Sequence, residues 1–350
     1  MQQLRLTVPG TDGVASTSSP RRTLLVVLLV SLATPGLACQ ADDVREPPQP
    51  RKVTAPERAP AYDAAVEPAQ AVLSLVPQSA DVVTVVDWDR VRAQLGVPEL
   101  TSEDLMTDRL DFWERASTEA VLLTDGLLRE ESSTFELDYG FTQDDVDWEA
   151  RWTGEDGPGF VLAFRPDLDL AGVRRAVRDG VGPLDGATVD RANTLLVAGG
   201  AETDVWASEE TWSALVREPA AATYLHRDCI PLNTALGPDA DAEDQQALLA
   251  EHPVTTLDAL SGFVVSYGDH QATVRVEPGR SDLFERLRMG EAWPTGEFAT
   301  TYVNGAADPS TGRIGFTLPR PVDAAGLALL EELPFGVCNE VVPIDEPTGL

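Results

Sequence analysis

Lysine is almost absent from this sequence of 350 residues, because Lys52 is the only one and the other 25 basic residues are arginines. Acidic residues number 58, which gives a formal net charge of -32. Such a surface repels nucleic-acid phosphates and anionic lipid headgroups, whose binding depends on lysine and arginine. We therefore exclude nucleic acid as a partner and expect the body to stand away from a membrane surface. Codon bias in a GC-rich genome is the favoured explanation of the low lysine content, and adaptation to high salt is the alternative.

Histidine and cysteine are also scarce, with three of each. The histidines lack helical ligand spacing, and the cysteines are too scattered for a zinc cluster. The Gly-x-Ser-x-Gly and Ser-x-x-Lys motifs of hydrolases and the Gly-Lys pair of a phosphate loop are missing as well. His226 has the chemistry of a general base, but a histidine at the surface or at a helix end is the simpler interpretation. The sequence thus predicts no catalytic residue, no cofactor site and no metal site.

Two acidic clusters, at residues 239–244 and 144–147, have the residue types of a calcium loop. In the first, Asp244 occupies the position where the turn requires glycine, and Ala250 occupies that of the bidentate glutamate. We interpret both clusters as solvated acidic loops. With so many carboxylates, some pair will lie at the separation that glycoside hydrolysis requires, so this chemistry stays open.

Seven tryptophans are spread along the chain, mostly at positions typical of a core. Trp148 and Trp152 share one face of a predicted strand with alternating polar residues. Exposed aromatic rings bind sugars and partners well, so this pair is the first to test for binding. Packing in the core is the favoured interpretation for most of the seven.

The N-terminal segment has the pattern of an export signal. Arg21 and Arg22 precede an apolar run over residues 24–33, and Pro35 and Gly36 end it. The run is far shorter than the ~20 residues that a membrane-spanning helix needs. Basic residues, a short apolar run and small residues predict a secretory signal at 1–38, with the general or the twin-arginine export route both open.

The residues at the end of this signal, Pro35-Gly36-Leu37-Ala38-Cys39, resemble the lipobox of bacterial lipoproteins. Ala38 matches the small residue before the cut, while Gly36 stands where that family usually has leucine. The resemblance implies cleavage before Cys39 and attachment of diacylglycerol to its sulfur. Cleavage by the ordinary signal peptidase, which would give a secreted protein, is the alternative.

Lipidation of Cys39 would leave an even number of cysteines, Cys229 and Cys338. In an oxidising envelope these two can form a disulfide, so we predict that they are bonded. The bond would hold the C-terminal helix against the start of the second half of the chain.

The sequence after Cys39 divides by composition. Residues 39–61 are polar and proline-rich, which predicts an extended tether. We predict two lobes after it, at 62–216 and 217–350, the second with an acidic C-terminal tail. The order strand, strand, helix, strand, strand around 146–198 recurs around 263–318, which raises the hypothesis of two similar lobes. The fold class we predict is α+β, with mostly antiparallel strands and helices packed on one face.

The predicted elements follow from hydrophobic periodicity and from turn residues. Strands are expected at 81–88, 135–139, 146–152, 160–164, 195–198, 205–207, 263–267, 272–276, 298–303 and 314–318. Helices are expected at 64–75, 89–95, from 101 onwards, after 166, and at 209–216, 247–250, 283–287 and 324–333.

We expect an extracytoplasmic lipoprotein that touches the membrane only through its lipid anchor. Its body is expected to be a non-catalytic binding or assembly module for an unknown envelope protein or ligand. A secreted hydrolase that uses carboxylates and a small-ligand carrier binding between two lobes are the alternatives. A cleft with two carboxylates, one of them desolvated, would favour the hydrolase. An exposed apolar patch would favour the binding module, and a deep apolar pocket the carrier.

Overall fold

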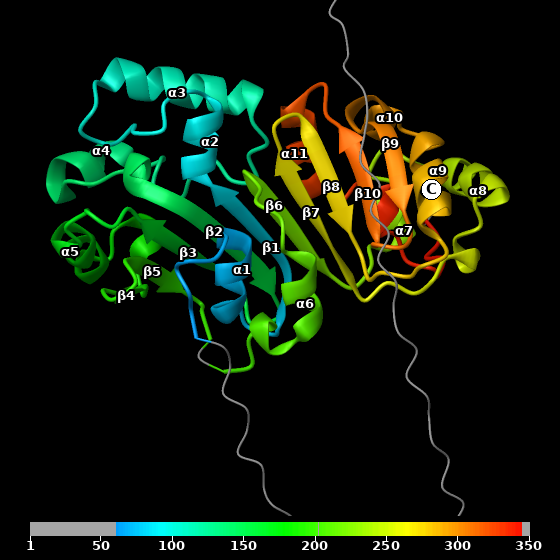
Figure 1. The fold of residues 1–350 in the computed structure, drawn as a ribbon, viewed down its shortest axis with the longest axis horizontal. Helices are drawn as coiled ribbons and strands as arrows, with labels where there is room; N and C mark the ends of the chain where they lie inside the picture. The colour runs from blue at the N-terminus through cyan, green and yellow to red at the C-terminus, as the bar shows by residue number, and fades with distance from the viewer. Residues whose placement is uncertain (1–60, 202, 345–350) are drawn as a thin grey trace, which may run out of the picture. The chain divides into compact units, whose positions relative to one another are not determined.

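The computed structural model describes residues 61–201 and 203–344 of the chain (Figure 1). Within these residues, all ten strands join one antiparallel sheet, and the fold is α+β as predicted. The strands are β1 Ala80–Asp87, β2 Val146–Gly154, β3 Gly159–Phe164, β4 Thr188–Asp190, β5 Leu195–Ala198, β6 Ala222–Arg227, β7 Gly262–Gly268, β8 Gln271–Arg275, β9 Val303–Asp308 and β10 Arg313–Thr317.

The strand order across the sheet is β4-β5-β3-β2-β1-β6-β7-β8-β10-β9. Reading outward from the central β1–β6 pair, each half places its first, second, third, fifth and fourth strand in the same order. The halves meet through the antiparallel pairing of β1 with β6, so they share one continuous sheet rather than two separate ones.

The helices among the described residues pack mainly on one face of this sheet. They are α1 Pro68–Ala71, α2 Trp88–Gln94, α3 Met106–Glu119, α4 Ser132–Thr134, α5 Ala171–Asp179, α6 Glu210–Leu215, α7 Leu232–Ala235, α8 Ala242–Glu251, α9 Leu283–Glu291, α10 Glu297–Thr301 and α11 Pro321–Leu329. The larger core lies between the sheet and α2, α3, α5, α9 and α11. On the other face, α1 and α6 enclose a smaller core with strands of the first half and with β6 and β7 (Figure 1).

Strand β1 shows why the sheet has two cores. Its β-branched side chains alternate between the two faces, so Val83 and Val85 join the smaller core while Val86 joins the larger one. A strand that is buried on both faces reads as a nearly continuous apolar run, which is why the sequence predicts it well.

Three segments predicted as strands are helical instead. Residues 135–139 form one turn of π-helix, residues 206–208 a 3-10 turn, and residues 297–301 the helix α10. In α10, Phe298 stacks on Tyr302 with ring centroids 4.7 Å apart. Aromatic residues four apart in sequence meet on one face of a helix, so this spacing indicates a helix and the strand prediction was wrong. Strand β9 begins only at Val303.

The central strand β6 was missed, and with it the position of His226. The sequence favoured a surface or helix-end histidine, but His226 lies in β6 and is 8% exposed. Its ring stacks on Phe263 of β7, with centroids 5.3 Å apart. The polar residues at the end of β6 conceal its strand character because their burial comes from neighbours that are distant in sequence.

Candidate functional site

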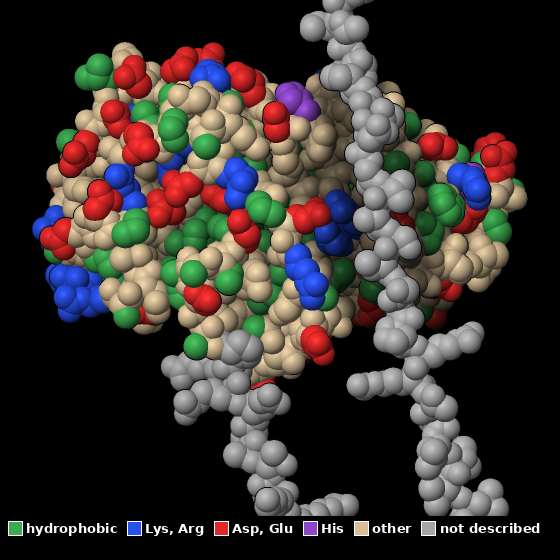
Figure 2. All heavy atoms as spheres, in the orientation of Figure 1, with side chains coloured by type: hydrophobic (Ala, Val, Ile, Leu, Met, Phe, Trp, Pro, Cys, Tyr) green, Lys and Arg blue, Asp and Glu red, His purple; other side chains and the backbone are tan. Residues whose placement is uncertain are grey.

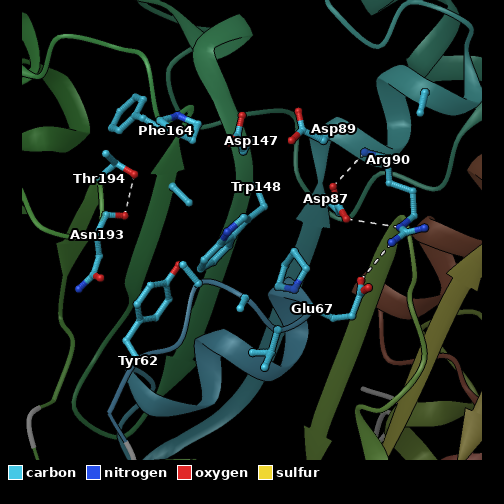
Figure 3. Close-up of a pocket in the computed structure, with 17 residues that line it drawn as sticks. Tyr62, Glu67, Asp87, Asp89, Arg90, Asp147, Trp148, Phe164, Asn193 and Thr194 are labelled. Atoms are coloured by element: carbon cyan, nitrogen blue, oxygen red, sulfur yellow. Dashed lines mark hydrogen bonds and ion pairs between the residues drawn. The ribbon is translucent and has the colours of Figure 1, made fainter.

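A cleft of about 540 Å³ lies where β1 ends and β2 begins (Figure 3). Five parts of the chain contribute to it: the segment leading into α1, the end of β1 with α2, the start of β2, the end of β3, and the loop before β5. The residues with functional side chains around it are Tyr62, Glu67, Asp87, Asp89, Arg90, Asp147, Trp148, Phe164, Asn193 and Thr194.

The carboxylates reach the cleft because β1 ends there and β2 begins there with an irregular residue. Asp87 closes β1 and caps α2, its side chain accepting a hydrogen bond from the Arg90 backbone N–H at 2.9 Å. Asp89 lies inside this helix, in its first turn. On β2, the pairing with β3 shifts register between Val146 and Trp148. Asp147 therefore stands in an irregular position, where a side chain can turn away from the ladder.

Two arginines are shared among four carboxylates at the cleft. Arg90 forms ion pairs with Glu67 at 3.1 Å and with Asp87 at 3.4 Å. Arg92 of α2 is 3% exposed, and its Nη2 contacts Asp89 at 2.5 Å. The same Nη2 is 3.9 Å from Asp147, and Arg92 also donates to the backbone carbonyls of residues 144 and 146. Acidic groups thus outnumber the guanidinium groups that neutralise them.

This imbalance changes the protonation of Asp147. Burial, followed by the negative charge of Asp89, raises the pKa of the Asp147 carboxyl to about 7, and Arg92 and Arg165 offset only part of the effect. Burial also raises the pKa of Asp87, although the Arg90 backbone N–H and guanidinium oppose it. The cleft therefore holds a carboxyl group that changes charge near neutral pH.

Aromatic side chains form the apolar part of the cleft. Tyr62 lies against Trp148 below Asp147, and the backbone of Asn193 and Thr194 faces them from the β5 side (Figure 3). Burial raises the pKa of the Tyr62 hydroxyl, with Asp190 contributing. Trp148 is 7% exposed, so little of its ring is accessible from the cleft.

A second cavity of about 260 Å³ adjoins the cleft and shares Asp89 and Asp147 with it. Arg92 and Arg165 line this second cavity but not the cleft. The two carboxylates therefore have arginines on one side and the aromatic cleft on the other.

No protein-family model, characterised protein or solved structure matches this chain. The cleft is accordingly interpreted from its own geometry and charge.

The two acidic clusters found in the sequence differ in the structure. Asp144 is 3% exposed and accepts hydrogen bonds from Arg109 Nε at 2.6 Å and Trp113 Nε1 at 2.8 Å, so its interpretation as part of a solvated loop was wrong. Asp145 is equally buried. In the other cluster, Asp241 caps α8. Within the described ranges, no group of three or more His, Cys, Asp or Glu side chains is placed to hold a metal ion.

The predicted disulfide between Cys229 and Cys338 is present and joins residues 109 positions apart. Arg286, which is 1% exposed, reinforces it by donating to the carbonyl oxygens of Phe335 at 3.0 Å and Val337 at 2.8 Å. The C-terminal segment is therefore held by a covalent bond and by buried hydrogen bonds. Cys39, the signal segment and most of the tether lie outside the described residues. Among the residues that are described, no helix has the length and apolar character to cross a bilayer.

An exposed apolar patch lies at the start of α3. Leu105 is 71% exposed, Leu110 is 61% exposed, and Leu137 of the adjoining π turn is 84% exposed. An ion pair of 3.0 Å between Arg109 and Glu136 joins the two segments. Acidic side chains gather along α3 at the upper left of Figure 2. The exposed leucines thus lie near acidic side chains, and exposed apolar groups of this kind suit contact with another molecule.

Proposed function

We propose that this protein is a lipoprotein of the cell envelope, anchored through Cys39, whose body is a non-catalytic binding module. Removal of the signal takes away Arg5, Arg21, Arg22 and Asp12, which leaves 23 basic and 57 acidic residues. A body with that charge is repelled by anionic headgroups, so it would be held near the membrane by its lipid and tether alone.

The cleft at the end of β1 is the proposed binding site. The observation that carries this proposal is that five separate parts of the chain bring aromatic and carboxyl groups to one cavity of about 540 Å³. That volume lies in the range of small-molecule sites, which combine apolar surface with a few placed polar groups. The acidic and apolar patch on α3 supports a second contact, with an assembly partner.

The proposed membrane anchoring is tested by replacing the sulfur of Cys39 with oxygen. Intact mass of the membrane-extracted protein should show a chain that begins at Cys39 and carries a diacylglycerol group. Cys39→Ser should move the protein to the soluble fraction. A Cys39→Ser protein that remains on the membrane at unchanged size would reject the anchor.

Binding at the cleft is tested by filling it. Ala93 lines the cleft and is exposed, so Ala93→Trp should occlude the cavity without disturbing the core. Ala250, exposed near the end of α8 and far along the chain, provides the matched control Ala250→Trp. Thermal-shift screening against saccharides, amines and short peptides should find stabilising compounds for wild type and the control but not for Ala93→Trp. Equal responses of all three proteins would argue against the cleft.

A hydrolase is the second candidate, because Asp147 with its raised pKa lies beside Asp89. One protonated and one ionised carboxyl are the acid and the nucleophile or base of glycoside hydrolysis. Turnover of aryl glycosides that is lost in both Asp147→Asn and Asp89→Asn would establish this function in place of binding alone.

A further inference from the structure

We propose that the ligand of the cleft is an organic cation, a primary ammonium or guanidinium group on a short apolar stem, with Asp89 and Asp147 as its counter-ions. This inference rests on the proposed function of the cleft as a ligand site, and it adds the chemical class of the ligand.

The charges around the cleft require a further cation for balance. Arg90 is held between Glu67 and Asp87, which leaves one excess negative charge on that side. Arg92 is shared between Asp89 at 2.5 Å and Asp147 at 3.9 Å, and it also donates to two backbone carbonyls. When Asp147 is ionised, a second excess negative charge therefore lies on the Asp89–Asp147 side, because nearby Arg165 is itself paired with Asp167 at 2.9 Å. Partly buried charges without a partner are costly, so a ligand that brings positive charge gains more here than in water.

The two cavities define the side from which the cation enters. On the side of the smaller cavity, Arg92 pairs with Asp89 and Arg165 pairs with Asp167, so the acidic groups there already have cations of their own. On the larger side, Asp89 and Asp147 face the cleft that contains Tyr62 and Trp148. Tyr62 is the more exposed of these two rings, and an aromatic ring of this kind attracts a cation to its face and buries an alkyl stem. Ammonium and guanidinium groups on a stem suit this combination of acidic rim and aromatic interior.

The carboxylates are not arranged as a metal site. In the described ranges no three acidic, histidine or cysteine groups converge to hold an ion. Calcium requires six to eight oxygen ligands, whereas one ammonium group is satisfied by two carboxylates and neighbouring carbonyl groups.

Protonation links ligand binding to pH. The groups that act on Asp147 are Asp89 and Arg92 of α2, Asp87 at the end of β1, and Arg165 after β3. Since Asp147 has a pKa of about 7, it is half protonated near neutral pH, and a bound cation would favour its ionised form. Binding should therefore release a proton below pH 7, and affinity should rise about tenfold from pH 6 to pH 8.

Isothermal titration with cadaverine tests the proposal in two buffers of different ionisation enthalpy, at pH 6 and pH 8. Wild type should bind about tenfold more tightly at pH 8 and release up to one proton at pH 6. Asp147→Asn should bind weakly, with no pH dependence and no proton release, because the charge that titrates is gone. Ala93→Trp should not bind, and Ala250→Trp should match wild type. The neutral analogue 1,5-pentanediol should not bind to any of these proteins.

Other outcomes separate this inference from the proposed function. If saccharides bind in an Ala93→Trp-sensitive manner and cadaverine does not, the cleft remains the ligand site and the cationic ligand is rejected. If calcium chloride alone binds and is lost in Asp147→Asn, the organic cation is likewise rejected. If saccharides, amines and calcium all fail to bind, both the inference and the cleft as a ligand site are rejected.

Discussion

Replacing Asp147 by asparagine should stabilise the protein at high pH, because the change removes a carboxylate that the fold disfavours. The pKa of Asp147 is about 7 in the folded protein against the ordinary aspartate value of 3.8, a difference of about three pKa units. At about 1.4 kcal/mol per unit, the upper limit is about 4 kcal/mol. The side chain is 24% exposed at the edge of an open cleft, so solvent screening reduces the effect, and we expect about 2 kcal/mol.

The sign follows from proton binding. Between pH 4 and pH 7, Asp147 holds a proton in the folded protein but not in the unfolded chain, so the stability of wild type falls as pH rises through this window. Above pH 7 both states are ionised and the loss is complete. Asp147→Asn lacks this fall. The two proteins should therefore have similar free energies of unfolding at pH 4 and differ by about 2 kcal/mol at pH 8.

Urea unfolding monitored by tryptophan fluorescence from pH 4 to pH 8.5 measures the difference. Asp81→Asn is the matched control, since Asp81 is an exposed carboxylate on β1. The control should run parallel to wild type throughout. Parallel curves for Asp147→Asn as well, with no divergence between pH 4 and pH 7, would show that Asp147 ionises freely and that the charge imbalance of the cleft is compensated.

Three further changes test the supports of the fold. Cys229→Ser with Cys338→Ser should lower the free energy of unfolding by about 4 kcal/mol, chiefly by freeing the unfolded chain, with near-ultraviolet circular dichroism unchanged. Arg286→Met should cost about 3 kcal/mol in chemical unfolding, because buried Asp282 and the carbonyl groups of residues 258, 335 and 337 lose a donor. A cost below about 1 kcal/mol would refute this role of Arg286. Gly159→Ala should cost about 1–3 kcal/mol by calorimetry, because its Cβ would lie 2.2 Å from the tryptophan ring opposite it on β2, and an unchanged melting temperature would contradict this.

The sequence predicted best the elements whose pattern is local. The β-branched run of β1 and the alternation of apolar and polar residues in β2 each predict a strand from consecutive residues alone. Strand β6 failed for the opposite reason. It lies at the centre of the sheet, but it is only six residues long and ends in the polar residues His226 and Arg227. Its strand character therefore becomes clear only from its pairing with strands that are distant in sequence. The prediction for α10 failed because its two aromatic residues, four positions apart, were interpreted as part of a strand.

The cleft was largely beyond the reach of sequence analysis. Asp144, Asp145 and Asp147 were read as one solvated cluster, yet the first two are buried in structural networks and only the third lines the cavity. Its partner Asp89 comes from a helix 58 positions earlier, and the register shift that releases Asp147 leaves no local pattern. The sequence Asp87-Trp88-Asp89 was the available clue, because it places two acids where β1 ends and α2 begins.

The repeated strand order gives the ends of β1 and β6 equivalent places in the architecture. Two positions after β1 stands Asp89, and two positions after β6 stands Cys229. One strand end thus leads to a charged hollow that can titrate, while its counterpart is closed by a covalent link to the C-terminal segment. Equivalent strand ends in the two halves are therefore finished differently, one by a disulfide to the C-terminal segment and the other by an open acidic cleft.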